Sequence, residues 1–279
     1  MARMTGGQAL VRSLATHGVD TVFGLPGVQL DHLFNAFHDE RNQVRVIHTR
    51  HEQGAGYLAF GYAVSTGKVG AYAVVPGPGF LNTTTALSTA YACNAPVLCI
   101  AGQVHTPFIG RGTGQLHEIP DQLGTMRGLT KWAMRAEHPT QVPELMREAF
   151  RQMASGRVRP AGIEIPPDVL GLQCDVEVGM PGIPPPPPVP DPDLIDKAAA
   201  LLGQAENPLI FVGGGIFGAE AELQVLAEML QAPVILSRAA GGAMSDRHTL
   251  AHRLQAGHRL WGKADVVLGV GTRLFPQVP

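Results

Sequence analysis

Short apolar runs alternate with amphipathic segments along most of the chain, and this alternation limits the possible folds more than any other feature. In the first part of the chain the apolar runs predict strands at 21–25, 44–48, 71–75, 96–101 and 162–165. The segments between them predict helices at 30–37, 52–66, 80–92 and 142–154. An earlier helix is expected to follow a capping box made by Thr5 and Gln8 and to end at Gly18. Strand–helix repeats with apolar strands imply a parallel sheet covered by helices on both faces.

A proline-rich run divides this pattern in two. Eight of the 23 prolines lie in 181–192 (PGIPPPPPVPDP), and such a run favours extended polyproline II over helix or sheet. We interpret it as a linker between domains, with a ligand for a proline-binding module as the alternative. We therefore expect a first domain at 1–175, a linker at 176–190 and a second domain at 191–279.

The second domain repeats the alternation of strands and helices. Its pattern predicts helices at 192–204, 219–231 and 249–261, and strands at 209–212, 234–237 and 266–270. The predicted fold class is therefore α/β, with two doubly wound parallel-sheet domains joined by the proline-rich linker. A doubly wound domain usually continues beyond the point where GTRLFPQVP follows the last expected strand, so we expect the second domain to be truncated.

Composition and charge exclude several classes of protein. The formal net charge is −2, whereas a protein that binds nucleic acid or an anionic membrane needs a basic face. Three cysteines without CxxC spacing argue against a disulfide framework and a structural zinc site, and they suit a reducing compartment. No apolar run approaches the ~20 residues of a membrane span, and no signal peptide is recognisable. We therefore expect a cytoplasmic protein without nucleic-acid or membrane partners.

A glycine motif in the second domain is a candidate nucleotide site. Gly213, Gly215 and Gly218 form a GxGxxG between an expected strand and helix, where glycines let the backbone approach a pyrophosphate. Ser237 stands where an acidic residue would bind a ribose. Gly213, Gly214 and Gly215 are therefore candidate nucleotide-binding residues, and a tight strand-to-helix turn is the alternative.

Three loops of the first domain follow expected strands, at 23–29 (FGLPGVQ), 48–55 (HTRHEQGA) and 75–82 (VPGPGFLN). The carboxyl ends of parallel strands meet at one edge of a sheet, which is where open α/β sheets bind ligands. Each loop alone could be an ordinary turn, and Glu52 alone could be a solvated acid at the start of a helix. Their occurrence together, in this order and spacing, predicts a binding site.

This array resembles the pyrimidine-binding domain of thiamine-diphosphate-dependent enzymes of the acetolactate synthase, benzaldehyde lyase and oxalyl-CoA decarboxylase superfamily. The matching segments are GLPG at 24–27, RHEQGAG at 50–56, STGKVG at 65–70, GPGFLN at 77–82, NAPVLCIAGQV at 94–104 and TKWAMR at 130–135. After the linker, FVGGGI and ADVVLGVGTRL are similar to the central domain of the family. Among these enzymes the acetolactate synthases are the nearest in pattern.

The resemblance implies roles for individual residues. Glu52 would hydrogen-bond N1′ of the aminopyrimidine and so activate the cofactor, which attacks a carbonyl carbon and serves as an electron sink. Val28 and Gln29 would face the substrate. Gln115 would hydrogen-bond a substrate oxygen, unless it is an exposed loop amide. The residues implied to shape the cofactor site beside Glu52 are Pro26, Gly27, Gly77, Pro78, Gly79 and Asn82.

The resemblance also implies partners that this sequence lacks. The family binds the diphosphate and Mg²⁺ through a C-terminal domain with a GDG…N motif, which is missing here, so no metal ligand is expected in this chain. We expect either a fragment of a longer enzyme or a subunit that needs a partner polypeptide, inactive by itself. A homodimer or homotetramer with the active site between subunits is implied. The central domain would hold FAD, ADP or no ligand.

We therefore expect a thiamine-diphosphate-dependent lyase or transferase that forms or cleaves a carbon–carbon bond next to the carbonyl of a 2-oxo acid. Decarboxylation and carboligation both remain open. The alternatives are a regulatory or oxidoreductase module that binds FAD, ADP or NAD around Gly213–Gly218, and a scaffold that kept the fold after losing its chemistry.

Overall fold

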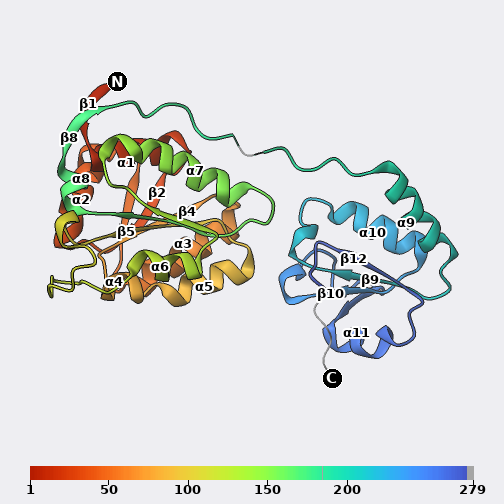
Figure 1. The fold of residues 1–279 in the computed structure, drawn as a ribbon. Coiled ribbons are helices and arrows are strands. Elements are labelled where there is room, and N and C mark those ends of the chain that lie inside the picture. The colour runs from red at the N-terminus through yellow and green to blue at the C-terminus, as the bar shows by residue number, and fades with distance from the viewer. Residues whose placement is uncertain (184, 275–279) are drawn as a thin grey trace. The chain divides into compact units, whose positions relative to one another are not determined.

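The chain forms two compact units, Met1–Pro187 and Pro188–Pro279, in a computed structural model that describes residues 1–183 and 185–274 (Figure 1). Position 184 of the predicted linker and positions 275–279 of the predicted second domain lie outside the described residues. Between Val176 and Pro192 the described residues form neither helix nor strand. Within the described ranges, no helix is both long enough and apolar enough to cross a membrane.

The first unit is built on a six-stranded sheet whose neighbouring strands all run parallel. In spatial order its strands are β3 (Arg45–His48), β2 (Thr21–Gly24), β4 (Gly70–Val74), β5 (Val97–Gly102), β7 (Ala161–Ile165) and β6 (Trp132–Arg135). The strands β4, β5 and β7 are buried at every position, as expected for a parallel sheet covered on both faces, and Glu164 is the one charged residue among them. Five of the six strands lie within one residue of the predicted bounds.

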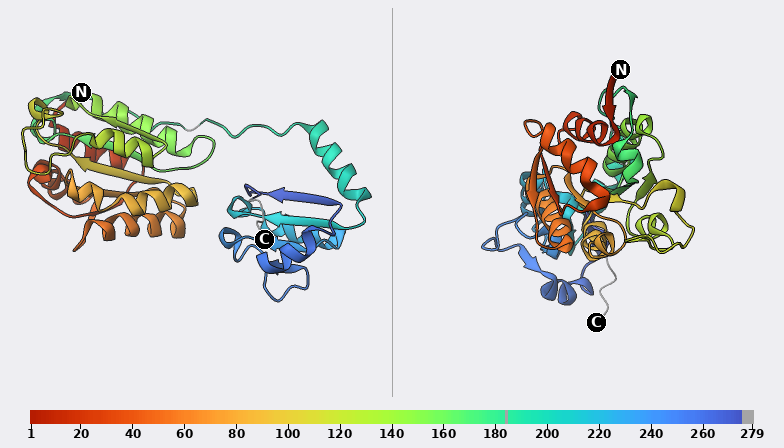
Figure 2. Two further views of the ribbon diagram at one scale, coloured as in Figure 1. Left: turned by 60° about the horizontal axis from the view of Figure 1, so that its bottom comes forward. Right: turned by 90° about the vertical axis from the view of Figure 1, so that its left-hand side faces the viewer.

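Helices cover both faces of this sheet, as the views in Figure 1 and Figure 2 show. One face carries α1 (Gly6–Thr16), α2 (Asp31–Asp39), α7 (Val142–Ala154) and α8 (Pro167–Gly171), whose core includes Leu10, Leu33, Met146 and Leu170. The other carries α3 (Glu52–Thr66), α4 (Pro78–Leu81), α5 (Thr84–Cys93) and α6 (Gln122–Leu129), whose core includes Ala59, Phe80, Leu87 and Met126. The predicted doubly wound α/β architecture is thereby confirmed for this unit.

The first unit also contains elements that the sequence pattern did not predict. The strands β1 (Ala2–Thr5) and β8 (Gln173–Val176) pair antiparallel in a separate two-stranded ribbon. These strands and β6 each have a single buried position, Met4, Val176 and Ala133 respectively, so their sequences carry no clear hydrophobic period. The predicted capping box is present, because Thr5 Oγ1 accepts from Gln8 N at 3.1 Å and Gln8 Oε1 accepts from Thr5 N at 3.0 Å.

The second unit contains a four-stranded parallel sheet. Its spatial order is β11 (Ala251–Arg253), β10 (Val234–Leu236), β9 (Pro208–Val212) and β12 (Val266–Val270), and its helices are α9 (Pro192–Gln204), α10 (Glu220–Leu230) and α11 (Leu254–Trp261). The prediction of a helix at 249–261 was wrong for its first residues, because 251–253 pairs with β10 as an edge strand. Tertiary pairing there overrides a helical pattern that continues correctly from Leu254.

We predict that Gly70→Ala destabilises the first unit. A Cβ on Gly70 would lie 1.9 Å from the carbonyl oxygen of Ala59, so β4 and α3 would have to move apart. Overpacking of this kind costs about 1–3 kcal/mol, which urea unfolding would detect as a lower midpoint. The control is Gly128→Ala on the exposed side of α6, where a Cβ would meet no atom within 4 Å, and its midpoint should not fall. Equal midpoints for the two variants would contradict the proposed close packing.

Candidate functional site

The order of strands in the first unit places a topological switch point at the carboxyl edge of its sheet. From β2 the chain goes to β3 on one side, and it then returns to β4 on the other side of β2. The chain thus leaves the ends of β2 and β4 in opposite directions, which separates the loops that follow these two strands. Open α/β sheets bind ligands where two such loops diverge. The loops after β2, β3 and β4 are the three that the sequence singled out.

Val75 shows how tightly the first and third loops pack. Cβ atoms built on Gly27 and Gly79 would lie 2.5 Å from Val75 Cγ1 and Cγ2 respectively. Real Cβ atoms do not approach carbon so closely, so both loops can flank this side chain only because each presents a glycine. The structure therefore brings Gly27 and Gly79 together around one buried valine.

Glu52, from the second loop, is the carboxylate of this site. It is the first residue of α3, behind an N-cap formed by His51, whose Nδ1 accepts from Gln53 N at 3.1 Å. The N-terminus of a helix favours a negative charge. Asn82 Nδ2 donates to Glu52 Oε2 at 2.9 Å, and Glu52 Oε1 lies 3.6 Å from the position that a Cβ on Gly79 would take. One oxygen is thus held by the third loop, and the other lies beside Gly79.

Gly77 begins the turn that forms the far wall of the site. Its φ of 55° lies in the left-handed region, and a Cβ here would lie 2.2 Å from the carbonyl oxygen of His117. Glycine is therefore required both by conformation and by space. Gln122 Oε1 accepts from the Gly77 N–H at 2.7 Å. Pro78 follows as the first residue of α4 and is exposed, like Pro26 in the first loop.

Gln29 and Val28 point to different surroundings. Gln29 is buried, and its Nε2 donates to the carbonyl oxygen of Leu116 at 3.0 Å while its Oε1 lies 3.3 Å from His117 Nδ1. Val28 is 70% exposed. Sequence reasoning missed His117, which a short polar loop places against both Gln29 and Gly77. The signal available was an imidazole beside Glu118 in a loop with three glycines, in GRGTGQLHE.

Gln115 is held within its own loop. Its Nε2 donates to Thr113 Oγ1 at 3.3 Å, and its backbone N–H donates to Glu118 Oε2 at 3.0 Å. The Glu118 carboxylate also accepts from the N–H groups of Gly112 and Gly114, so it organises the loop around itself. These bonds fit the alternative in which Gln115 is a loop amide. The side chain from this loop that reaches Gln29 is His117.

The glycine motif of the second unit is explained by backbone packing. A Cβ on Gly213 would lie 2.2 Å from the carbonyl oxygen of Gly271, and one on Gly215 would lie 2.8 Å from Gly271 Cα. The helix after the motif, α10, starts only at Glu220, and Glu220 Oε2 accepts from the Gly218 N–H at 2.8 Å. A carboxylate of the chain thus already accepts from the Gly218 N–H, two residues before the helix start. These contacts favour the tight-turn alternative over a nucleotide site.

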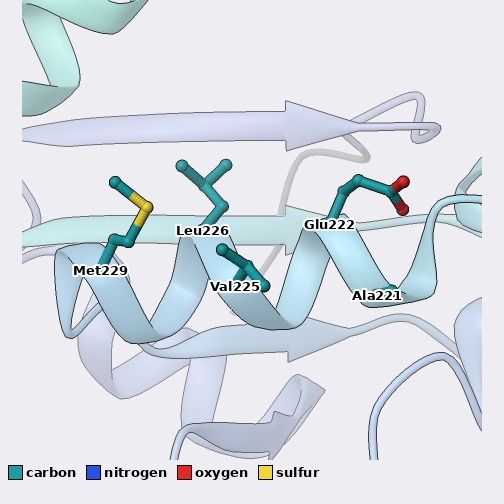
Figure 3. Close-up of a pocket in the computed structure, with 5 residues that line it drawn as sticks. All are labelled: Ala221, Glu222, Val225, Leu226 and Met229. Atoms are coloured by element: carbon teal, nitrogen blue, oxygen red, sulfur yellow. The ribbon is translucent and has the colours of Figure 1, made fainter.

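A shallow groove along α10 is lined almost entirely by apolar side chains. It is lined by Ala221, Glu222, Val225, Leu226 and Met229, which come from successive turns of the helix (Figure 3). Glu222 is the one ionisable side chain among them. Elsewhere in residues 1–183 and 185–274, no group of three or more His, Cys, Asp or Glu side chains is arranged to hold a metal ion.

Comparison with known proteins supports the assignment made from the loops. Residues 4–125 match the family model described as "Thiamine pyrophosphate enzyme, N-terminal TPP binding domain", and residues 195–278 match "Thiamine pyrophosphate enzyme, central domain". The first match contains all the loops of the candidate site. The two matches together span most of the chain, which therefore belongs to the thiamine pyrophosphate (thiamine diphosphate) enzyme family.

Relatives among characterised proteins extend over nearly the whole chain. A probable 2-ketoarginine decarboxylase AruI of Pseudomonas aeruginosa is 38% identical over 280 residues, covering 97% of this chain and 49% of the relative. A probable acetolactate synthase large subunit of Methanocaldococcus jannaschii is 35% identical, with 99% and 48% covered. An acetolactate synthase of Arthrospira platensis is 36% identical, with 99% and 50% covered. The chain thus spans about half the length of these relatives.

We predict that Val75→Ala rescues Gly79→Ala. The single change Gly79→Ala places a methyl group against Val75 Cγ2 and should lower the free energy of unfolding by about 1–3 kcal/mol. Removing the Val75 methyl groups relieves this clash, since the two Cβ atoms would then be 3.5 Å apart. Urea unfolding of both single variants and the double variant should give a favourable coupling of about 1 kcal/mol or more. Simple additivity would show that Gly79 and Val75 do not make this close contact.

Proposed function

We propose that this chain supplies the pyrimidine side of a thiamine diphosphate site, in an enzyme that forms or cleaves a carbon–carbon bond next to the carbonyl of a 2-oxo acid. The observation that carries the proposal is the Glu52 carboxylate, held by Asn82 and lying beside Gly79 at the switch point of the sheet. When bound, thiamine diphosphate supplies an electron sink for the pair of electrons of the reacting bond.

The residues of the site have distinct proposed tasks. Glu52 Oε1 is the atom that would share a proton with a pyrimidine nitrogen, because Oε2 already accepts from Asn82. Gly27, Gly77 and Gly79 would shape the loops beside the ring, since each lies too close to Val75 or His117 to carry a Cβ. The fit is a matter of donor chemistry: Glu52 Oε1 is the carboxylate oxygen that Asn82 does not hold, and it lies beside Gly79. Pro26 and Pro78 would form the exposed rim.

The substrate class is proposed from the relatives and from the rim of the site. One relative is named for decarboxylation of 2-ketoarginine and others for synthesis of acetolactate, so lyase and transferase activities are both candidates. Val28, which is exposed in the loop after β2, is proposed to contact the substrate. Gln29 and His117 would contribute polar groups there. Gln115 could reach a substrate oxygen only by giving up its bond to Thr113.

Other parts of the complete site are proposed to come from elsewhere. The relatives are about twice as long as this chain, so we place the diphosphate and Mg²⁺ on a further segment or a partner polypeptide, without which the chain would not turn over substrate. We do not extend the proposal to FAD, ADP or NAD, because backbone packing accounts for Gly213 and Gly215. A cytoplasmic location is consistent with the three cysteines, all of which are free thiols.

We predict that Glu52→Gln abolishes turnover in the full-length protein. An amide cannot exchange a proton with the pyrimidine nitrogen as a carboxylate can, so the rate constant at saturating cofactor should fall by at least about 100-fold, the lower range for loss of a proton-transfer group. Steady-state assays with pyruvate and other 2-oxo acids would measure this. Glu137→Gln, which changes an exposed glutamate of the same unit, should keep full activity. Wild-type rates in Glu52→Gln would remove Glu52 from this role.

We also propose that a second copy of the chain covers the outer side of α3 and α5. These helices pack side by side, linked by bonds from Tyr57 to Thr89 and from Gln53 to Thr85. Their outer side exposes large apolar side chains, 46% of Leu58 and 39% of Tyr91 among them. Glu52 is half-buried at the start of α3, so a chain seated here would also shield the carboxylate. Exposed large apolar side chains on neighbouring helices are typical of an interface.

We predict that Leu58→Asp weakens self-association. A carboxylate at the centre of the proposed interface would have to be desolvated without a partner, and sedimentation velocity should show a shift toward the monomer at micromolar concentration. Val225→Asp provides the matched control, since Val225 is an exposed apolar residue of α10 in the other unit. The same assembly for wild type and Leu58→Asp would exclude this face as the interface.

A further inference from the structure

Gln122 makes an unusual set of buried hydrogen bonds behind the site. It is the first residue of α6 and is 1% exposed. Its Oε1 accepts from the N–H of Gly77 at 2.7 Å, while its Nε2 donates to the carbonyl oxygen of Gly102 at 2.8 Å and to Glu164 Oε2 at 3.0 Å. One side-chain amide therefore connects the turn after β4, the end of β5 and a carboxylate on β7.

Glu164 determines which way this amide points. An amide has one accepting and one donating end, and the two are similar in size, so its orientation depends on its partners. A carboxylate and a carbonyl oxygen accept only, so together they require the NH₂ group and leave the oxygen for Gly77. Glu164 is fully buried and pairs with Arg135, its cross-strand neighbour on β6. A buried carboxylate is stable only with such partners.

The same amide stabilises two turns that meet at the candidate site. Gly77 packs against His117, and a Cβ on Gly102 would lie 3.0 Å from Pro76 Cδ and 3.5 Å from Gln29 Cβ. Displacing either glycine would therefore move a wall of the site. Gln122 itself is almost fully buried, so it acts through the backbone that it holds.

We infer that Gln122 is a positioning residue for the Gly77 turn, with its amide oriented by the buried Glu164–Arg135 pair, and that this pair thereby sets how well the site accepts the pyrimidine ring. The role in cofactor binding rests on the proposed function. The anchoring of the turn does not, because every bond that carries it lies within this chain.

The test is Gln122→Met in the full-length protein, a change that keeps the side-chain length and removes the amide. Loss of these bonds should weaken binding of thiamine diphosphate by about tenfold or more, measured by isothermal titration calorimetry well below the unfolding temperature. Hydrogen exchange without cofactor should become faster in the peptide that contains Gly77. Glu164→Gln, which keeps an acceptor for Gln122 but loses the charge that pairs with Arg135, should show a smaller change in the same direction.

Glu40→Gln is the control for a merely structural effect. It removes the carboxylate of the Arg12–Glu40 ion pair in the same unit, away from the three loops. Wild-type affinity and exchange in Gln122→Met would overturn the inference, as would an equal loss of affinity in Glu40→Gln. If Gln122→Met does not fold, Glu164→Gln decides by the same two measurements. If the wild-type protein binds no thiamine diphosphate, the proposed function fails, and the exchange of Gly77 alone decides whether Gln122 anchors the turn.

Discussion

At the carboxyl edge of the six-stranded sheet, backbone segments lie closer together than a Cβ atom would allow. Val75 is enclosed by Gly27 and Gly79, and Gly77 lies against the carbonyl group of His117. The candidate site depends on this close approach, because it brings the first and third loops to opposite sides of one strand end. Glu52 then enters from the second loop, at the start of a helix. A side chain at any of these glycines would clash with Val75 or His117 and would therefore displace a loop of the candidate site.

The polar groups inside the first unit are arranged to hold this edge in place. Gln122 and Glu164 are buried behind the Gly77 turn, and their bonds satisfy one another. Two other buried polar groups belong to the core itself. Burial raises the pKa of the Cys99 thiol to about 12, so it stays protonated and is no nucleophile at neutral pH. The hydroxyl of Tyr72, whose pKa burial also raises, donates to Thr83 Oγ1 at 2.9 Å.

Much of the fold could be predicted because its strands are buried on both faces and its helices have marked ends. The helix at Glu52–Thr66 was predicted with both bounds correct, since Gly67 ends it in the left-handed conformation. The four-residue strands β1, β6 and β8 could not be predicted, because their stability comes from pairing with distant segments. The same holds for β11, which pairing with β10 makes a strand despite its helical pattern.

For the site, the sequence by itself determined that three glycine-containing loops and Glu52 lie at one edge of a parallel sheet, because strand direction and connection are encoded in local pattern. It also determined the family, through the order and spacing of those loops. Only the tertiary structure decided which side chains meet: His117 reaches Gln29, Val28 faces outward, and Gln115 bonds within its own loop. It also revealed Gln122 and Glu164, far from the loops in sequence. The physical reason is that hydrogen bonds and close packing between distant segments depend on positions within an ångström, which hydrophobic period and turn chemistry do not specify.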